Sequence, residues 1–134
     1  MEQGMRIFIS LASSVLFIAQ ASAADFDASY KWCNPSFRTT SPSIDFKNVP
    51  KETSKLEMTI VDHYNGKYHL DVTVDYKNQK KFDCGELNNK WNGLMYPPGH
   101  CAGGVQHTYE LTIKALDKSG TTLSKKSFSR GCPE

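Results

Sequence analysis

The amino-acid sequence predicts a mainly β domain. Apolar and polar residues alternate along three stretches, 55–62, 68–76 and 107–115, and a period of two residues is typical of strands with one buried face. Between residues 25 and 55, prolines recur at short intervals. Proline disfavours helix at the residue before it. No window of eleven residues shows the apolar stripe of an amphipathic helix.

Residues 1–23 are predicted to be a secretory signal peptide. Arg6 precedes an apolar run from Ile7 to Ile18, and the small residues of Ala21–Ala23 suit a cleavage site. The run is shorter than the roughly 20 apolar residues that cross a bilayer. A membrane anchor is therefore the less favoured alternative, and no stable membrane insertion is predicted. The mature domain would span 24–134 and be exported, to the periplasm or out of the cell.

A turn with an Asn-Gly pair joins the first two alternating stretches, which is typical of a β-hairpin. A two-residue loop would set apolar residues against polar ones. A three-residue loop at 64–66, with its glycine in the left-handed region, instead pairs Ile60 with Leu70. A slip of one residue moves every side chain to the other face, so burial favours the three-residue loop. In this register Asp62 lies on the buried face and His69 on the opposite one.

The third alternating stretch places His107 and Tyr109 on one face, because they are two residues apart. The same face carries the apolar residues Leu111 and Ile113. A weaker pattern near Thr122–Phe128 predicts a last strand.

The composition excludes several functions. With 134 residues the chain holds one domain at most, and its net charge of +2 comes from scattered lysines and arginines, so no nucleic-acid partner is predicted. Neither a nucleophile-elbow motif nor a phosphate-binding glycine-rich loop occurs. We therefore expect no enzyme activity, no cofactor and no metal.

Four cysteines lie in the predicted mature chain: Cys33, Cys84, Cys101 and Cys132. An even number in an exported protein indicates two disulfides, and the spacings do not suit a zinc site. Three pairings are possible. The favoured one joins Cys33 to Cys132, tying the two ends of the domain, and Cys84 to Cys101, closing a short loop.

Two segments carry a family resemblance. Residues 41–62 contain a Ser-Pro pair, an aromatic residue, a Val-Pro pair and a strand ending at an acid. Residues 97–99 read Pro-Pro-Gly, and 107–117 read His-Thr-Tyr followed by a strand ending Ala-Leu-Asp. The two resemble, in order, the two signatures of the phosphatidylethanolamine-binding proteins, which include Raf-kinase-inhibitor-like bacterial proteins. The chain resembles a reduced and divergent bacterial member.

The resemblance implies a fold and a site. The fold would be a phosphatidylethanolamine-binding-protein-like antiparallel β-sheet domain, here stapled by two disulfides, with a small anion pocket at one end of the sheet. Transferred residue by residue, the ligand-binding positions would be Asp62, His69, Pro97, Pro98, His107 and Tyr109.

The chain also departs from the family pattern. Asp62 is followed by His-Tyr-Asn-Gly instead of the family's Pro-Asp-x-Pro, and Thr108 replaces an arginine. Leu94 and Tyr96 stand where small residues are usual and could fill the pocket. An insertion at 100–106 carries one of the cysteines. These changes affect the inferred ligand more than the inferred fold.

The expected function is non-catalytic binding of a small anionic or phosphate-bearing ligand, of the phospholipid head-group type. The alternative is a secreted protein-interaction or inhibitor module with a closed pocket and a protein partner. Two simpler roles stay open: Asp62 as the cap of a turn, and His107 as a hydrogen-bonded histidine at the core's edge. The sequence does not define an oligomeric state.

Overall fold

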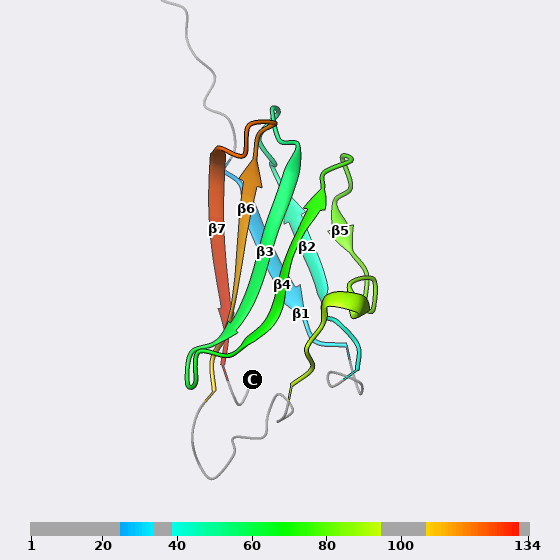
Figure 1. Ribbon diagram of the computed structural model, residues 1–134, viewed down its shortest axis with the longest axis vertical. Helices are drawn as coiled ribbons and strands as arrows, with labels where there is room; N and C mark the ends of the chain where they lie inside the picture. The colour runs from blue at the N-terminus through cyan, green and yellow to red at the C-terminus, as the bar shows by residue number, and fades with distance from the viewer. Residues whose placement is uncertain (1–24, 34–38, 95–106, 132–134) are drawn as a thin grey trace, which may run out of the picture.

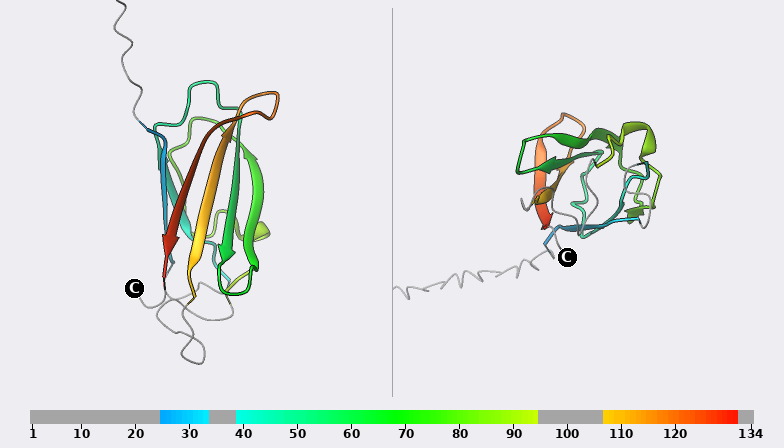
Figure 2. Two further views of the ribbon diagram at one scale, coloured as in Figure 1. Left: turned by 90° about the vertical axis from the view of Figure 1, so that its left-hand side faces the viewer. Right: turned by 90° about the horizontal axis from the view of Figure 1, so that it is seen from below.

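The computed structural model describes residues 25–33, 39–94 and 107–131. In this part of the chain, seven strands form two antiparallel sheets whose apolar faces meet (Figures 1 and 2). The first sheet has the order β1-β2-β5, with β1 at Asp27–Lys31, β2 at Ser43–Lys47 and β5 at Lys81–Phe82. The second has the order β4-β3-β6-β7, with β3 at Lys55–Asp62, β4 at Tyr68–Asp75, β6 at Tyr109–Leu116 and β7 at Thr122–Arg130.

The mainly β prediction is confirmed, and each alternating stretch forms a strand of the four-stranded sheet. The sequence reading missed the three-stranded sheet, whose strands are too short to show a long alternation. The described residues contain one short 3-10 turn, η1, at Asn88–Lys90. No helix in this described part is long and apolar enough to cross a membrane.

The core lies between the two sheets, where the alternating side chains meet. Strands β1, β2 and β3 bury every second residue, because successive side chains point to opposite faces. Strands β1 and β2 contribute Tyr30 and Ile44, and both are fully buried. From the larger sheet come Leu56, Met58, Ile60, Leu111 and Ile113, all likewise fully buried.

The β3–β4 hairpin has the predicted core register but a different turn. Ile60 pairs with Leu70, as expected. The Asp62 N–H donates to the Lys67 carbonyl at 2.9 Å. Asp62 and Lys67 therefore face each other, and the loop between them is 63–66, one residue longer than predicted. A β-bulge between Ile60 and Val61 offsets this extra residue. The pairing of the core residues is therefore the same as with the shorter turn.

The bulge overturns the predicted position of His69. Val61 pairs with Tyr68 and Ile60 with Leu70, so His69 is the residue without an opposite partner. Its side chain is buried, at 3% exposure, and not on the outer face. Two contacts with the Asn92 backbone hold it: its carbonyl accepts from the Asn92 N–H at 2.8 Å, and its ring Nδ1 lies 2.8 Å from the Asn92 carbonyl.

The disulfide is Cys33–Cys84, so the predicted pairing of these two cysteines was wrong. Strands β1 and β5 flank β2 and both run antiparallel to it, so they run parallel to each other and end at the same edge. Each cysteine lies two residues past its strand, and their Cα atoms are 5.9 Å apart. Sequence spacing alone could not reveal this sheet order. Cys101 and Cys132 lie outside the described residues, and so does the predicted signal peptide.

Strand β7 forms an edge of the larger sheet, beside β1 (Figure 2). None of its side chains is buried. Lys126 pairs with Ile113 in the register, so it lies on the core-facing side of the strand. Its ammonium group lies 3.6 Å from a carboxylate oxygen of Asp27 on β1.

The turn geometry predicts a penalty for a side chain at Gly66. Its φ is +70°, and a Cβ added there would meet no atom within 4 Å, so the cost is one of backbone conformation alone. Gly66→Val should lower the free energy of unfolding by about 1 kcal/mol or more. Gly66→Asn should cost less, because asparagine tolerates this conformation. Denaturant unfolding measures both, and equal stability of the three proteins would contradict the turn described here.

The disulfide should appear in peptide mapping without reductant as a Cys33–Cys84 cross-link. The two residues are 51 apart, and the chain-entropy model assigns such a loop about 4 kcal/mol of stabilisation as an upper value. Cys84→Ala should therefore lower the melting temperature strongly. Recovery of Cys33 in a peptide linked to any other cysteine would contradict the structure.

Candidate functional site

A buried histidine–aspartate pair lies at the end of the four-stranded sheet. Asp62 is the last residue of β3, and it pairs with Tyr109 at the start of β6. His107 precedes β6 by two residues, so its side chain reaches the same face. Its Nδ1 lies 2.6 Å from Asp62 Oδ2, and the two side chains are only 4% and 3% exposed. A carboxylate accepts hydrogen bonds, so Nδ1–H is the donor.

The second oxygen of Asp62 is also engaged. Oδ1 accepts from the Tyr64 N–H at 2.9 Å, in the local turn that aspartate commonly makes. The ring of Tyr64 lies over His107, with centroids 4.8 Å apart. Asp62 is thus both the cap of the hairpin turn and the partner of the buried histidine. The simpler role that the sequence left open is real, and it coexists with the pair.

Tyr109 adds a hydroxyl beside the pair. Its ring lies nearly parallel to His107, with centroids 6.2 Å apart, and its side chain is buried. Burial, and then the negative charge of Asp62, raise the pKa of Tyr109 to about 12. The hydroxyl therefore keeps its proton at ordinary pH and can donate. The backbone carbonyl of Tyr109 accepts from the Tyr30 hydroxyl at 2.7 Å, which fixes this strand end to β1.

His69 completes the group from β4. Its Nδ1 faces a carbonyl, so Nδ1 carries the proton and Nε2 is the acceptor in the neutral ring. Nε2 is buried and has no hydrogen-bond partner in the described residues. The ring centroid lies 5.6 Å from that of Tyr109 and 6.1 Å from that of Trp91.

The structure thus gathers four of the six residues predicted for the site: Asp62, His69, His107 and Tyr109. Pro97 and Pro98 lie outside the described residues. Sequence reasoning missed Tyr64, although an aspartate two residues earlier in a turn is a recognisable signal. It also missed the carbonyl of Asn92, for which the sequence holds no signal. Among the described residues, no three side chains could together hold a metal ion.

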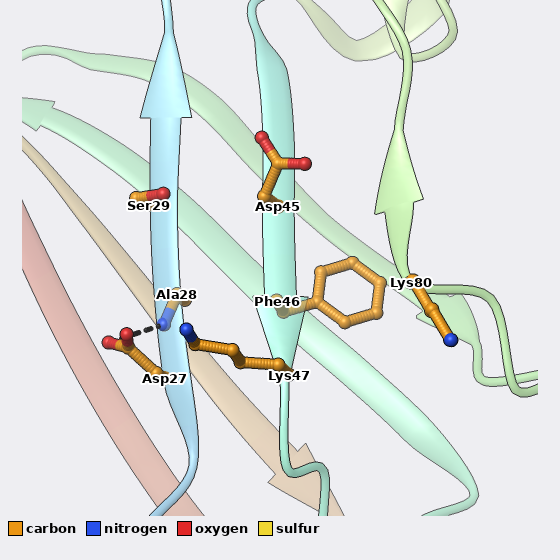
Figure 3. Close-up of a pocket in the computed structure, with 7 residues that line it drawn as sticks. All are labelled: Asp27, Ala28, Ser29, Asp45, Phe46, Lys47 and Lys80. Carbon is orange, nitrogen blue, oxygen red and sulfur yellow. Dashed lines mark hydrogen bonds between the residues drawn. The ribbon is translucent and has the colours of Figure 1, made fainter.

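A separate groove lies on the three-stranded sheet. It has a volume of about 300 Å³ and contains none of the predicted site residues (Figure 3). Its charged groups are balanced, two carboxylates against two ammonium groups, so it shows no preference for an anion. Its lining residues are Asp27, Ala28, Ser29, Asp45, Phe46, Lys47 and Lys80.

Comparison with known proteins shows a likeness of fold. No protein-family model matches the chain, and no curated protein matches it. A solved structure that resembles it is that of Escherichia coli YbcL, described as a new member of the mammalian PEBP family. The TM-score is 0.53 at 14% identity, over 72% of this chain and 81% of that one. The likeness supports a phosphatidylethanolamine-binding-protein-like (PEBP-like) fold.

The raised pKa of Tyr109 predicts a late step in a tyrosine titration. Absorbance should show the Tyr109 hydroxyl ionising near pH 12, against about 10 for exposed tyrosines. A folded-state pKa above the unfolded value means that the stabilisation is complete below about pH 10. It is then lost as the pH rises through about 12. Tyr109→Phe should lower the amplitude near pH 12 by one hydroxyl, whereas Tyr68→Phe, at an exposed residue, should leave that amplitude unchanged. An unchanged amplitude near pH 12 in Tyr109→Phe would contradict the assignment.

Proposed function

We propose that the protein binds a small phosphate-bearing anion, without catalysis, at the end of the four-stranded sheet. The observation that carries the proposal is the buried His107–Asp62 hydrogen bond beside the hydroxyl of Tyr109. Polar groups are costly to bury. Three such groups gathered at the end of a sheet are better explained by a ligand than by packing alone.

The donors suit a phosphate. When both ring nitrogens of His107 are protonated, Nδ1–H stays on Asp62 and the ring carries a positive charge next to the ligand. The Tyr109 hydroxyl is a second donor. Both oxygens of Asp62 already accept hydrogen bonds. Its negative charge is therefore directed at His107 and the Tyr64 N–H, and it opposes the anion less than a free carboxylate would.

The fold likeness supports a binding function of this kind. YbcL is described as a PEBP-family member, and the resemblance of the sequence implies a head-group-type ligand for the same residues. The proposal includes export to the periplasm or beyond, in keeping with the predicted signal peptide. The Cys33–Cys84 disulfide is compatible with an oxidising compartment.

A second candidate function is a protein-interaction or inhibitor module with a closed pocket. One observation favours it: Leu94, which stands where the family usually has a small residue, is 2% exposed and belongs to the core cluster. A bulky side chain buried at this position takes up volume that a ligand would need.

Calorimetric titration with inorganic phosphate and with phosphorylethanolamine, at pH 5.5 and 7.5, tests the proposal. Affinity should be higher at pH 5.5, because a histidine that takes up its second proton carries a positive charge that attracts the anion. His107→Ala should remove the higher affinity at pH 5.5. Tyr109→Phe should weaken binding about ten-fold, the usual loss for a hydrogen bond to a charged group.

His63→Ala is the matched control, because the His63 side chain is exposed and its ring lies 3.6 Å from Glu110. Circular dichroism and melting curves identify any variant that has lost its fold. If the folded protein binds neither anion at either pH, the anion site is wrong and the interaction module becomes the better candidate. A higher affinity at pH 5.5 that survives in His107→Ala would also contradict the proposal.

A further inference from the structure

The turn between β3 and β4 is an unusual surface. Residues 63–68, the hairpin tip, are six consecutive exposed residues at the lower end of the molecule in Figure 1. Tyr64 is 59% and Tyr68 54% exposed. In the described part of the chain, they and Leu123 are the large hydrophobic side chains that face solvent. Leu123 belongs to β7 next to the β6–β7 turn, at the opposite end of the sheet.

The hairpin tip carries a positive charge and no negative one. Lys67 is exposed, and no acidic residue occurs from 63 to 70. The preceding Asp62 is buried, and its oxygens bind His107 and the Tyr64 N–H. His63 lies 3.6 Å from Glu110, which is the nearest acid on the adjacent strand β6. The tip therefore presents two aromatic rings with one fixed positive charge between them.

This combination suits the boundary between lipid and water. Tyrosine has an apolar ring and a polar hydroxyl, and it is enriched at the head-group level of bilayers. A lysine near an anionic bilayer raises affinity about five-fold. The exposed backbone of a turn would not be satisfied in the hydrocarbon core. The tip is thus suited to the head-group layer and not to a deeper position.

We propose that the hairpin tip docks on the surface of a membrane that contains anionic lipids. Tyr64 and Tyr68 would lie at the level of the head groups, and Lys67 would contact lipid phosphates. The ring of Tyr64 packs on His107, so docking brings the Asp62–His107 end of the sheet close to the lipid surface. The inference concerns a surface outside the anion site and does not need that site to bind a ligand.

Vesicle flotation tests the docking, with phosphatidylcholine alone and with phosphatidylcholine containing phosphatidylglycerol. The protein should bind the anionic vesicles more tightly. Lys67→Gln should lower this affinity about five-fold, and Tyr68→Ser should lower it about as much or more. The matched controls lie at the opposite end of the sheet: Lys118→Gln and Leu123→Ser remove an exposed lysine and an exposed apolar residue there. Both should bind like the unchanged protein.

A second measurement, tryptophan fluorescence, reports on the tip itself. The apolar segment 7–18 is the same in every variant, so vesicle binding through that segment would not distinguish them. Tyr68→Trp should show a blue shift of its fluorescence on addition of anionic vesicles, relative to the unchanged protein. Leu123→Trp should show none. Tyr68 is preferred to Tyr64 for these substitutions because Tyr64 contacts His107.

Each result decides the inference. Loss of binding in the tip variants but not in the controls supports it, as does the shift at position 68. Equal binding by tip and control variants, absence of binding to anionic vesicles, or a shift only at position 123 would overturn it and leave a protein partner as the occupant of the tip. Phosphate titration of Lys67→Gln separates this inference from the proposed anion site. Lys67 is not part of that site, so its phosphate affinity should equal that of the unchanged protein whether or not vesicles bind.

Discussion

The pairing of Ile60 with Leu70 is the constraint on which the rest of the site depends. The apolar face of the large sheet must continue from β4 through β3 to β6, and a slip of one residue would expose it. The β3–β4 turn is one residue too long for this register, and the bulge corrects the difference. The bulge turns His69 inward, while Asp62 stays on the buried face at the strand end. The core register thus brings both residues toward Tyr109.

The sequence was informative where a pattern was long or local. Eight-residue alternations defined the strands of the large sheet, and the Asn-Gly pair defined the hairpin with its left-handed Gly66. It was uninformative where the outcome depends on neighbours far along the chain. The disulfide follows from the order β1-β2-β5, and His69 is buried through its bonds to Asn92. Neither the sheet order nor that contact leaves a signature in the residues involved.

Four of the residues that the sequence resemblance predicts for the site lie at one end of the four-stranded sheet. Asp62, His69, His107 and Tyr109 were assigned from short motifs, and the structure brings their side chains into one group. The tight β3–β4 turn has a physical role, because it supplies the N–H of Tyr64 to Asp62. This local contact holds the aspartate in place.

The inward-facing Lys126 of β7 has a consequence for how the protein behaves when crowded. An edge strand exposes unpaired backbone groups on which another chain can build a strand. Docking a second strand there would crowd the ammonium group of Lys126 and its contact with Asp27 between two backbones, with a cost in desolvation. Since β7 buries none of its side chains, it offers little apolar surface to offset that cost. The inward-facing Lys126 therefore disfavours the addition of a foreign strand at the β7 edge.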